Sequence, residues 1–397
     1  MDYENRQYIS GRVLSHLRET LNMQFTPQRL DKVHRAMKRE EIDALLVTRR
    51  QDVQYLTGYQ CKVASVPLGC LITQDQQPEL VLPNKQELIL SRESVMAKIR
   101  LFNQRPSEEG SQTRGAAFWD EISGILKEHG LTSSMIGLQH EYLSVREFEK
   151  IKHALPEAGF KDFSPSLWKL RHIKDAAEID SIRKAVNIGE IGVRTALEVV
   201  APGKSEEEVS LEIESAMRAV GGQKRGIRAA VLSGSQAHFP YTEPGVSRIN
   251  DDQLVIIDIT VSHSGYFGKL ARTIHLGEPT NKQRKLFDYV VNAAQLLEKR
   301  LKPEVQIKDV AEKTLKKLGR GFPQDTIIQP IGNSIGLDLF EPPYIIPEAQ
   351  QALRQGMVFS IHPTGFISGA GACKIADVVL ITEKGYENLT ALARETM

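Results

Sequence analysis

The chain has 397 residues, a formal net charge of +1 and a charged fraction of 25%. This length favours two domains over one, and the hydrophobic fraction of 41% is ordinary for a globular protein. A charge so close to zero argues against a bulk attraction to nucleic acid or to an acidic membrane surface. No stretch approaches the roughly 18 consecutive apolar residues of a membrane span. We therefore expect neither nucleic acid nor a membrane as a partner.

The three cysteines, Cys61, Cys70 and Cys373, form no CxxC pair and no even-numbered disulfide framework. Residues 1–22 are charged throughout and lack the apolar segment of a signal peptide. Together these features predict a cytoplasmic protein. No glycine-rich dinucleotide motif, P-loop or HExxH helix is present, so we expect no cofactor.

The first part of the chain alternates short apolar runs with an amphipathic helix. Strands are predicted at 43–48, 68–73, 79–82, 100–102 and 135–138, with a helix at about 115–129. This alternation predicts an α/β domain over residues 1–165. The polar, proline-containing segment 162–166 is the expected linker.

The second part begins with a long predicted helix at about 176–200, which Ala201-Pro202-Gly203 ends. Ser205 and Glu208 have the spacing of a capping box for the next helix. Further strands and two helices follow in less regular alternation, with the helices at about 281–301 and 307–318. We therefore predict an α+β domain over residues 166–397.

Five segments, in order and at matching spacing, resemble the creatinase / aminopeptidase P / prolidase family, whose C-terminal domain has the pita-bread fold. They are Thr57-Gly58-Tyr59, 174–182, 255–259 with Gly265-Tyr266 and Arg272-Thr273, 332–338 with Glu341-Pro342, and 356–361. The resemblance implies a ribonuclease-H-like α/β domain followed by a pita-bread α+β domain. It also implies a homodimer in which the first domain of one subunit covers the pocket of the other.

Metalloenzymes of this family hold two metal ions with two aspartates, one histidine and two glutamates. The matching positions here are Asp258, Lys269, Asn333, His362 and Ala376. A dinuclear site needs several carboxylates, so the resemblance implies that the metal site is lost. A single ion held by Asp258, His362 and Cys373 is the alternative.

Creatinase has the same fold without metal and uses a histidine in an A-H-x-P-x-T stretch as its acid/base. Residues 237–242 match that stretch, which makes His238 the corresponding candidate, since imidazole suits proton transfer near neutral pH. The alternative is that the loop around His238 serves packing only. A carboxylate that creatinase uses on its substrate falls on Ala271, which argues against creatine as the substrate.

The candidate site residues fall into two groups. The candidate catalytic residues are His238, Lys269 and His362, and the candidate substrate-binding residues are Tyr241, Asp258, Arg272, Asn333 and Lys374. Lys269 could pair with Asp258, clamp a substrate carboxylate or act as a catalytic amine. Arg272 could equally form an ion pair within the fold.

From these positions we predict a metal-independent hydrolase that cleaves a non-peptide C–N bond in a small carboxylated metabolite, with His238 moving the proton. The mapped pocket is basic or neutral, so it should favour an anionic or neutral ligand. The alternatives are a lyase or decarboxylase on the same scaffold, a catalytically silent binding module and, least favoured, a residual metallopeptidase.

Overall fold

The computed structural model describes residues 27–61, 66–74, 76–84, 97–103, 115–234, 237, 242–318 and 327–394. The chain divides into two compact units, with unit 1 ending at Leu170 and unit 2 beginning at Arg171. In the described part of the chain, no helix combines the length and the apolar character that crossing a membrane requires.

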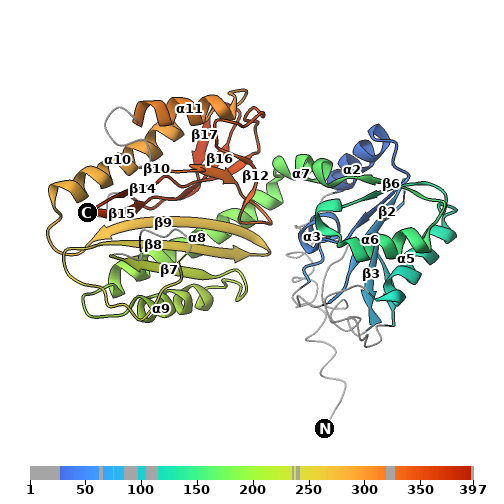
Figure 1. Cartoon of the computed structure of the whole chain (residues 1–397), viewed down its shortest axis with the longest axis horizontal. Helices are drawn as coiled ribbons and strands as arrows, with labels where there is room; N and C mark the ends of the chain where they lie inside the picture. The colour runs from blue at the N-terminus through green and yellow to red at the C-terminus, as the bar shows by residue number, and fades with distance from the viewer. Residues whose placement is uncertain are drawn as a thin grey trace, which may run out of the picture. The chain divides into compact units, whose positions relative to one another are not determined.

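Unit 1, which contains the strands labelled β2, β3 and β6 in Figure 1, is built on a six-stranded mixed sheet in the order β4-β3-β2-β1-β5-β6. The strands are β1 (Ala44–Val47), β2 (Gly69–Thr73), β3 (Glu79–Pro83), β4 (Lys98–Phe102), β5 (Met135–Leu138) and β6 (Gly159–Asp162). The helices are α2 (Pro27–Arg39), α3 (Arg50–Thr57), α5 (Ala116–Glu128), α6 (Val145–Ala154) and α7 (Ser164–His172). The predicted helix and strands of this half are present.

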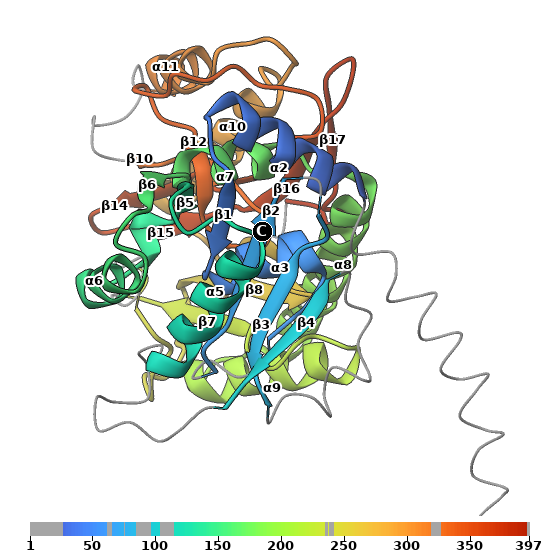
Figure 2. The same ribbon diagram turned by 90° about the vertical axis from the view of Figure 1, so that its right-hand side faces the viewer.

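The core of unit 1 lies between the sheet and helices α5 and α6, and Figure 2 shows α5 lying across the strands. Phe118, Ile122 and Ile125 of α5 pack with Leu46 of β1 and other buried strand residues. These α5 positions follow the helical spacing that puts apolar side chains on one face. Burial of that face therefore fixes the helix against the sheet.

The segment 162–166, which was expected as a linker, spans the end of strand β6 and the start of helix α7. Asp162 accepts hydrogen bonds from the backbone and the hydroxyl of Ser164, at 3.0 and 2.6 Å, and Pro165 follows in the first turn, where a missing N–H is harmless. The polar residues and the proline thus begin a helix, and the two units part within α7, after Leu170.

The described residues of unit 2 form three small sheets and four longer helices. The helices are α8 (Ala176–Val199), α9 (Glu206–Ala219), α10 (Asn281–Glu298) and α11 (Ile307–Leu318). The sheets are β7-β8-β9, β12-β11-β13-β16-β17 and β10-β14-β15. Their strands are β7 (Arg228–Ser233), β8 (Leu254–His263), β9 (Tyr266–His275), β10 (Ile327–Ile328), β11 (Gly332–Ser334), β12 (Glu341–Tyr344), β13 (Val358–Ile361), β14 (Thr364–Ile367), β15 (Gly371–Lys374), β16 (Asp377–Ile381) and β17 (Tyr386–Asn388).

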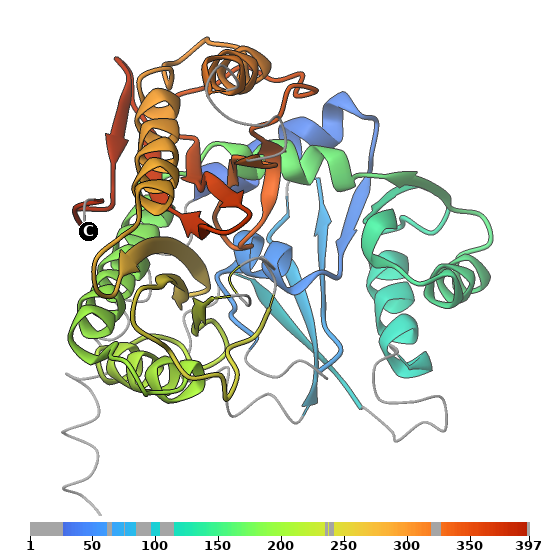
Figure 3. The ribbon, with the colours of Figure 1, turned by 60° about the vertical axis from the view of Figure 1, so that its left-hand side comes forward.

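Strands lie between two pairs of helices in unit 2, and Figure 3 shows the green helices α8 and α9 on one side and the orange helices α10 and α11 on the other. Close packing of α8 on the β8–β9 hairpin requires Gly268, because a Cβ there would lie 2.9 Å from the backbone of Ala185 and Val186. The hairpin joins the strands beyond it through paired backbone hydrogen bonds between Ala271 and Ala376, of 3.1 and 3.0 Å. This arrangement confirms the predicted α+β organisation.

Candidate functional site

The β8–β9 hairpin carries the first two residues of the site. Asp258 on β8 lies opposite Ala271 on β9, so Lys269 is its diagonal neighbour on the same face of the hairpin. The Lys269 ammonium lies 2.6 Å from Asp258 Oδ1 and donates to Thr260 Oγ1 at 3.3 Å. Asp258 and Lys269 therefore form the ion pair that was one of the interpretations of Lys269.

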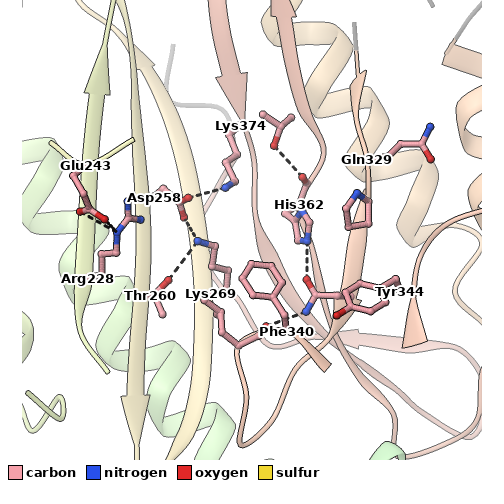
Figure 4. A pocket seen from close by; sticks show the side chains of 14 residues that line it. Arg228, Glu243, Asp258, Thr260, Lys269, Gln329, Phe340, Tyr344, His362 and Lys374 are labelled. Carbon is pink, nitrogen blue, oxygen red and sulfur yellow. Dashed lines mark hydrogen bonds and ion pairs between the residues drawn. The ribbon is translucent and has the colours of Figure 1, made fainter. Parts of the chain in front are cut away.

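A second ammonium group reaches the same carboxylate from strand β15. Lys374 Nζ donates to Asp258 Oδ2 at 2.6 Å (Figure 4). Strand β15 is held beside β9 by Thr273, whose hydroxyl accepts from Lys374 N at 2.8 Å and donates to Lys374 O at 2.9 Å. One carboxylate thus lies between two ammonium groups, and we call Asp258, Lys269 and Lys374 the lysine–aspartate cluster.

Burial and charge act against each other in this cluster. Burial alone would raise the pKa of the Asp258 carboxyl, but the ammonium groups of Lys269 and Lys374 outweigh it and hold that pKa well below its usual range. Burial lowers the pKa of the Lys269 amine to about 8, against the pull of the Asp258 carboxylate and with the Lys374 ammonium adding to the lowering. At neutral pH the cluster therefore holds one negative and mainly two positive charges.

Asn333 and His362 form a second polar pair in the site. They belong to neighbouring strands, since β11 pairs with β13 and His362 directly follows β13. Asn333 Nδ2 donates to the carbonyls of Ser334 and Leu339, at 2.6 and 2.9 Å, which leaves Asn333 Oδ1 as the acceptor for His362 Nε2 at 2.8 Å. The neutral imidazole must therefore carry its proton on Nε2.

Titration of His362 is predicted to lie far below neutral pH. Burial, followed by the ammonium groups of Lys374 and Lys269, lowers the pKa of the imidazole to about 3. In NMR spectra of protein labelled with ¹⁵N-histidine, we expect one ring, identified by its loss in His362→Gln, to stay neutral from pH 5 to pH 8 with the proton on Nε2. A titration step in that interval would contradict this electrostatic picture. A ring that stays neutral favours a hydrogen-bonding role for His362 over the predicted acid/base role.

These groups line a pocket of about 660 Å³. Besides the cluster and the Asn333–His362 pair, the pocket has a side formed by Pro330, Leu339, Phe340 and Tyr344, which we call the apolar wall. Phe340 and Tyr344 are 44% and 37% exposed, so their rings are available to a ligand. The pocket is therefore basic at one end and apolar along another side.

Sequence reasoning did not select several residues that line the pocket. These are Arg228, Glu243, Thr260, Gln329, Pro330, Leu339, Phe340, Tyr344 and Thr364. Thr260 could have been found, because it follows Asp258 by two residues on one strand and so shares its face. The others come from loops and strands whose convergence no local spacing reveals.

The other predicted site residues have different outcomes. Arg272 is not among the residues that line this pocket. It is fully buried, and its guanidinium forms the fold-level ion pair with Asp377 at 2.7 Å. Its predicted substrate-binding role stays a prediction. His238 and Tyr241 lie outside the residues that the structure describes. Their predicted roles stay predictions.

Comparisons with known proteins agree with this fold over nearly the whole chain. The family described as Creatinase/Prolidase N-terminal domain matches residues 29–173, and the family described as Metallopeptidase family M24 matches residues 180–383. An Xaa-Pro dipeptidase of Pyrococcus furiosus is 29% identical over 382 residues, covering 93% of this chain and 99% of that relative. The Xaa-Pro dipeptidase of Pyrococcus horikoshii is 27% identical, and the match covers 94% of this chain and 99% of that relative.

Solved structures give the same architecture. The prolidase from Pyrococcus furiosus superposes with a TM-score of 0.79 at 26% identity, covering 91% of this chain and all of that one. A prolidase from Pyrococcus horikoshii gives a TM-score of 0.82 at 24% identity. The fold therefore consists of a creatinase-type N-terminal domain and a pita-bread C-terminal domain. The chain belongs to metallopeptidase family M24.

The family name raises the question of whether the residues present fit a metal centre. In the described part of the chain, no group of three or more His, Cys, Asp or Glu side chains could hold a metal ion. At the ligand positions implied by the resemblance, Asp258 is neutralised by two ammonium groups 2.6 Å from its oxygens, and Ala376 has no donor side chain. The described residues therefore do not fit a dinuclear centre.

The relatives overturn the function predicted from the sequence. Two relatives that match over 93% and 94% of the chain are Xaa-Pro dipeptidases, whose names describe peptide hydrolysis. The prediction of metal-independent hydrolysis of a non-peptide C–N bond was therefore wrong. That prediction inferred a new class of substrate from the loss of metal-binding carboxylates. A change in the metal-binding side chains does not by itself change the class of substrate.

Proposed function

We propose that this protein is a peptide-directed hydrolase that acts on short peptides of the Xaa-Pro dipeptide class in the pocket of unit 2. The observation that carries this proposal is the end-to-end correspondence with an Xaa-Pro dipeptidase, which covers 93% of this chain and 99% of the relative. The reaction adds one water across the peptide bond and releases the Xaa amino acid and proline. The cysteine usage and the resemblance support, as part of the proposal, a cytoplasmic homodimer.

The chemistry of the pocket supports a ligand of this kind. A volume of about 660 Å³ is ample for a dipeptide. The apolar wall suits the pyrrolidine ring of proline, because Phe340 and Tyr344 offer ring surface that a ligand would cover. The lysine–aspartate cluster suits a negative group, because it holds two ammonium groups and one carboxylate. An amphiphilic molecule with an apolar ring and a carboxylate fits both features.

Hydrolysis assays with matched dipeptides test this function. Gly-Pro, Ala-Pro and Leu-Pro would be incubated with the protein as purified, after chelator treatment, and after addition of Mn²⁺, Co²⁺ or Zn²⁺, and free proline would be measured by mass spectrometry. We expect proline release from the Xaa-Pro peptides and none from Pro-Gly or Gly-Leu. Absence of both release and calorimetric binding in every metal state would overturn the proposal.

A variant pair locates the peptide in the pocket. Phe340→Ala is expected to weaken Gly-Pro binding by about tenfold, since losing most of an aromatic contact removes about 1–2 kcal/mol of apolar burial. Val246→Ala is the matched control, because Val246 is 84% exposed and is not among the residues lining this pocket. Equal binding by the two variants would show that the peptide does not use the apolar wall.

A further inference from the structure

The ammonium groups of the lysine–aspartate cluster have more hydrogen-bond donors than the described residues use. Two ammonium groups carry six N–H bonds. Among the described residues, Lys374 Nζ contacts only Asp258 Oδ2, while Lys269 Nζ contacts Asp258 Oδ1 and Thr260 Oγ1. Three N–H bonds therefore remain for an acceptor, and both lysines line the pocket.

We infer that Lys269 and Lys374, held by Asp258, form a carboxylate-binding site, in which Asp258 and Lys269 occupy two of the positions that match the family's metal ligands. The inference rests on the proposed function, since it takes the ligand carboxylate to be the C-terminus of a short peptide. The two ammonium groups stand in for cations as the positive charges of the pocket. Asp258 then orients the two lysines and does not act as a metal ligand.

The charges lining the pocket favour an anion over a cation. Asp258 and Glu243 contribute two negative charges, and Arg228, Lys269 and Lys374 contribute three positive charges, which leaves an excess of one positive charge. Glu243 is already paired with Arg228 at 3.1 Å, and His362 is neutral at physiological pH because its pKa is lowered to about 3. A divalent cation beside Asp258 would meet two ammonium groups at close range, whereas a carboxylate would meet complementary charge.

Hydrogen-bond geometry favours a carboxylate with two oxygens. The side chains of Lys269 and Lys374 lie on opposite oxygens of Asp258 and converge from different strands, as Figure 4 shows. A ligand carboxylate can accept one charge-assisted hydrogen bond from each ammonium group. Thr260 accepts from Lys269, so its hydroxyl proton is still available to donate to the ligand. The apolar wall then receives the rest of the peptide.

A comparison of two ligands and two variants tests the site. Gly-Pro would be compared with Gly-Pro amide by calorimetry, using wild type, Lys374→Met and Lys282→Met. Met has the length of the lysine stem without its charge, and Lys282 is an exposed residue of α10 that serves as the control. We expect Gly-Pro to bind wild type and Lys282→Met at least tenfold more tightly than the amide, and Lys374→Met to bind both ligands equally weakly. Equal binding of peptide and amide by wild type would overturn the inference.

Two further measurements separate this inference from the proposed function. Titration of wild type with sodium acetate against sodium chloride, at equal ionic strength, would follow the ¹⁵N signals of the lysine side chains. Acetate-specific shifts that vanish in Lys374→Met, without peptide binding, would support the site and refute the peptide function. Peptide binding that Lys374→Met leaves unchanged would refute the site and leave the function standing. Calorimetric titration of chelator-treated wild type with Mn²⁺ is expected to show no stoichiometric uptake, and uptake of one or two equivalents would overturn the inference.

Discussion

Replacement of Arg272 by methionine is expected to lower the free energy of unfolding of unit 2 by about 3–5 kcal/mol, the range for removing one partner of a buried ion pair. The Arg272 side chain is fully buried and donates to Asp377 Oδ1 at 2.7 Å. It also donates to four backbone carbonyls, those of Ala271, Ala376, Leu392 and Ala393, at 2.8 to 3.0 Å. Methionine fills part of the space but leaves five acceptors without this donor, and three of them belong to the buried residues Ala271, Ala376 and Asp377.

Two buried cysteines allow each unit to be followed separately during denaturation. Cys373 is fully buried in unit 2 and Cys70 is fully buried in unit 1, so the denaturant dependence of their alkylation reports the opening of each unit. Arg354→Met is the control, because Arg354 pairs with Glu304 at the surface, where both side chains are more than half exposed, and should change stability by less than about 1 kcal/mol. Unchanged Cys373 protection together with weaker peptide binding would support the substrate-binding role of Arg272.

The fold was largely predictable because its helices carry strong local signals. The long helix α8 (Ala176–Val199) lies within one residue of its prediction, and the capping box of Ser205 and Glu208 is present at the start of α9. The sequence pattern predicts strands only at 254–258 and 273–276, so β8 (Leu254–His263) and β9 (Tyr266–His275) are longer than expected. Charged residues inside a buried strand interrupt the apolar pattern, and the ion pairs of Asp258 with Lys269 and Lys374 offset the cost of burying them.

The contacts within the site were predictable only where they are local. Asp258 and Lys269 lie on one hairpin, so their ion pair was foreseen as one interpretation of Lys269. The contact of Lys374 with the same carboxylate spans 116 positions and depends on how β15 docks against β9. No spacing in the sequence encodes that docking, and the basic character of the site was inferred without the second ammonium group at its centre.

The position of Arg272 away from the pocket-lining residues has a related cause. Arg272 lies in a segment that resembles the family. Such a resemblance identifies a position in the fold but does not say which way the side chain at that position points. Successive side chains of a strand point to opposite faces. Lys269 shares its face with Ala271, so Arg272 points away from the cluster toward Asp377. Applying this alternation to β9 from Lys269 onward would have excluded Arg272 from the pocket.

Replacement of Asp258 by asparagine is expected to destabilise unit 2 by about 3–5 kcal/mol at pH 6, because it leaves two buried ammonium groups without their counter-charge. Asp258 is 4% exposed and both lysines contact it at 2.6 Å. The measurement is again Cys373 protection against denaturant, with Asp309→Asn as the control. Asp309 pairs with Lys313 on the surface of α11 at 3.4 Å, and its loss should change stability by less than about 0.5 kcal/mol.

The pH dependence of the stability lost in Asp258→Asn distinguishes a charge effect from a packing effect. In wild type the pKa of Lys269 is lowered to about 8 while the Asp258 carboxylate opposes the lowering, so in Asp258→Asn it should fall further. The pKa of such a lysine is lower in the folded protein than its value of about 10.4 in the unfolded chain. Its ammonium group therefore lowers the free energy of unfolding most at pH values below the folded-state pKa, and this loss of stability becomes smaller as the pH rises. Between pH 6 and pH 7.5 Lys269 of wild type stays mainly protonated, whereas one of the two buried lysines of the variant should lose its proton. The difference in free energy of unfolding between wild type and Asp258→Asn should therefore shrink by about 1 kcal/mol or more over this interval. A difference that is constant with pH would show that Asp258 acts through packing and not through the charges of the two lysines.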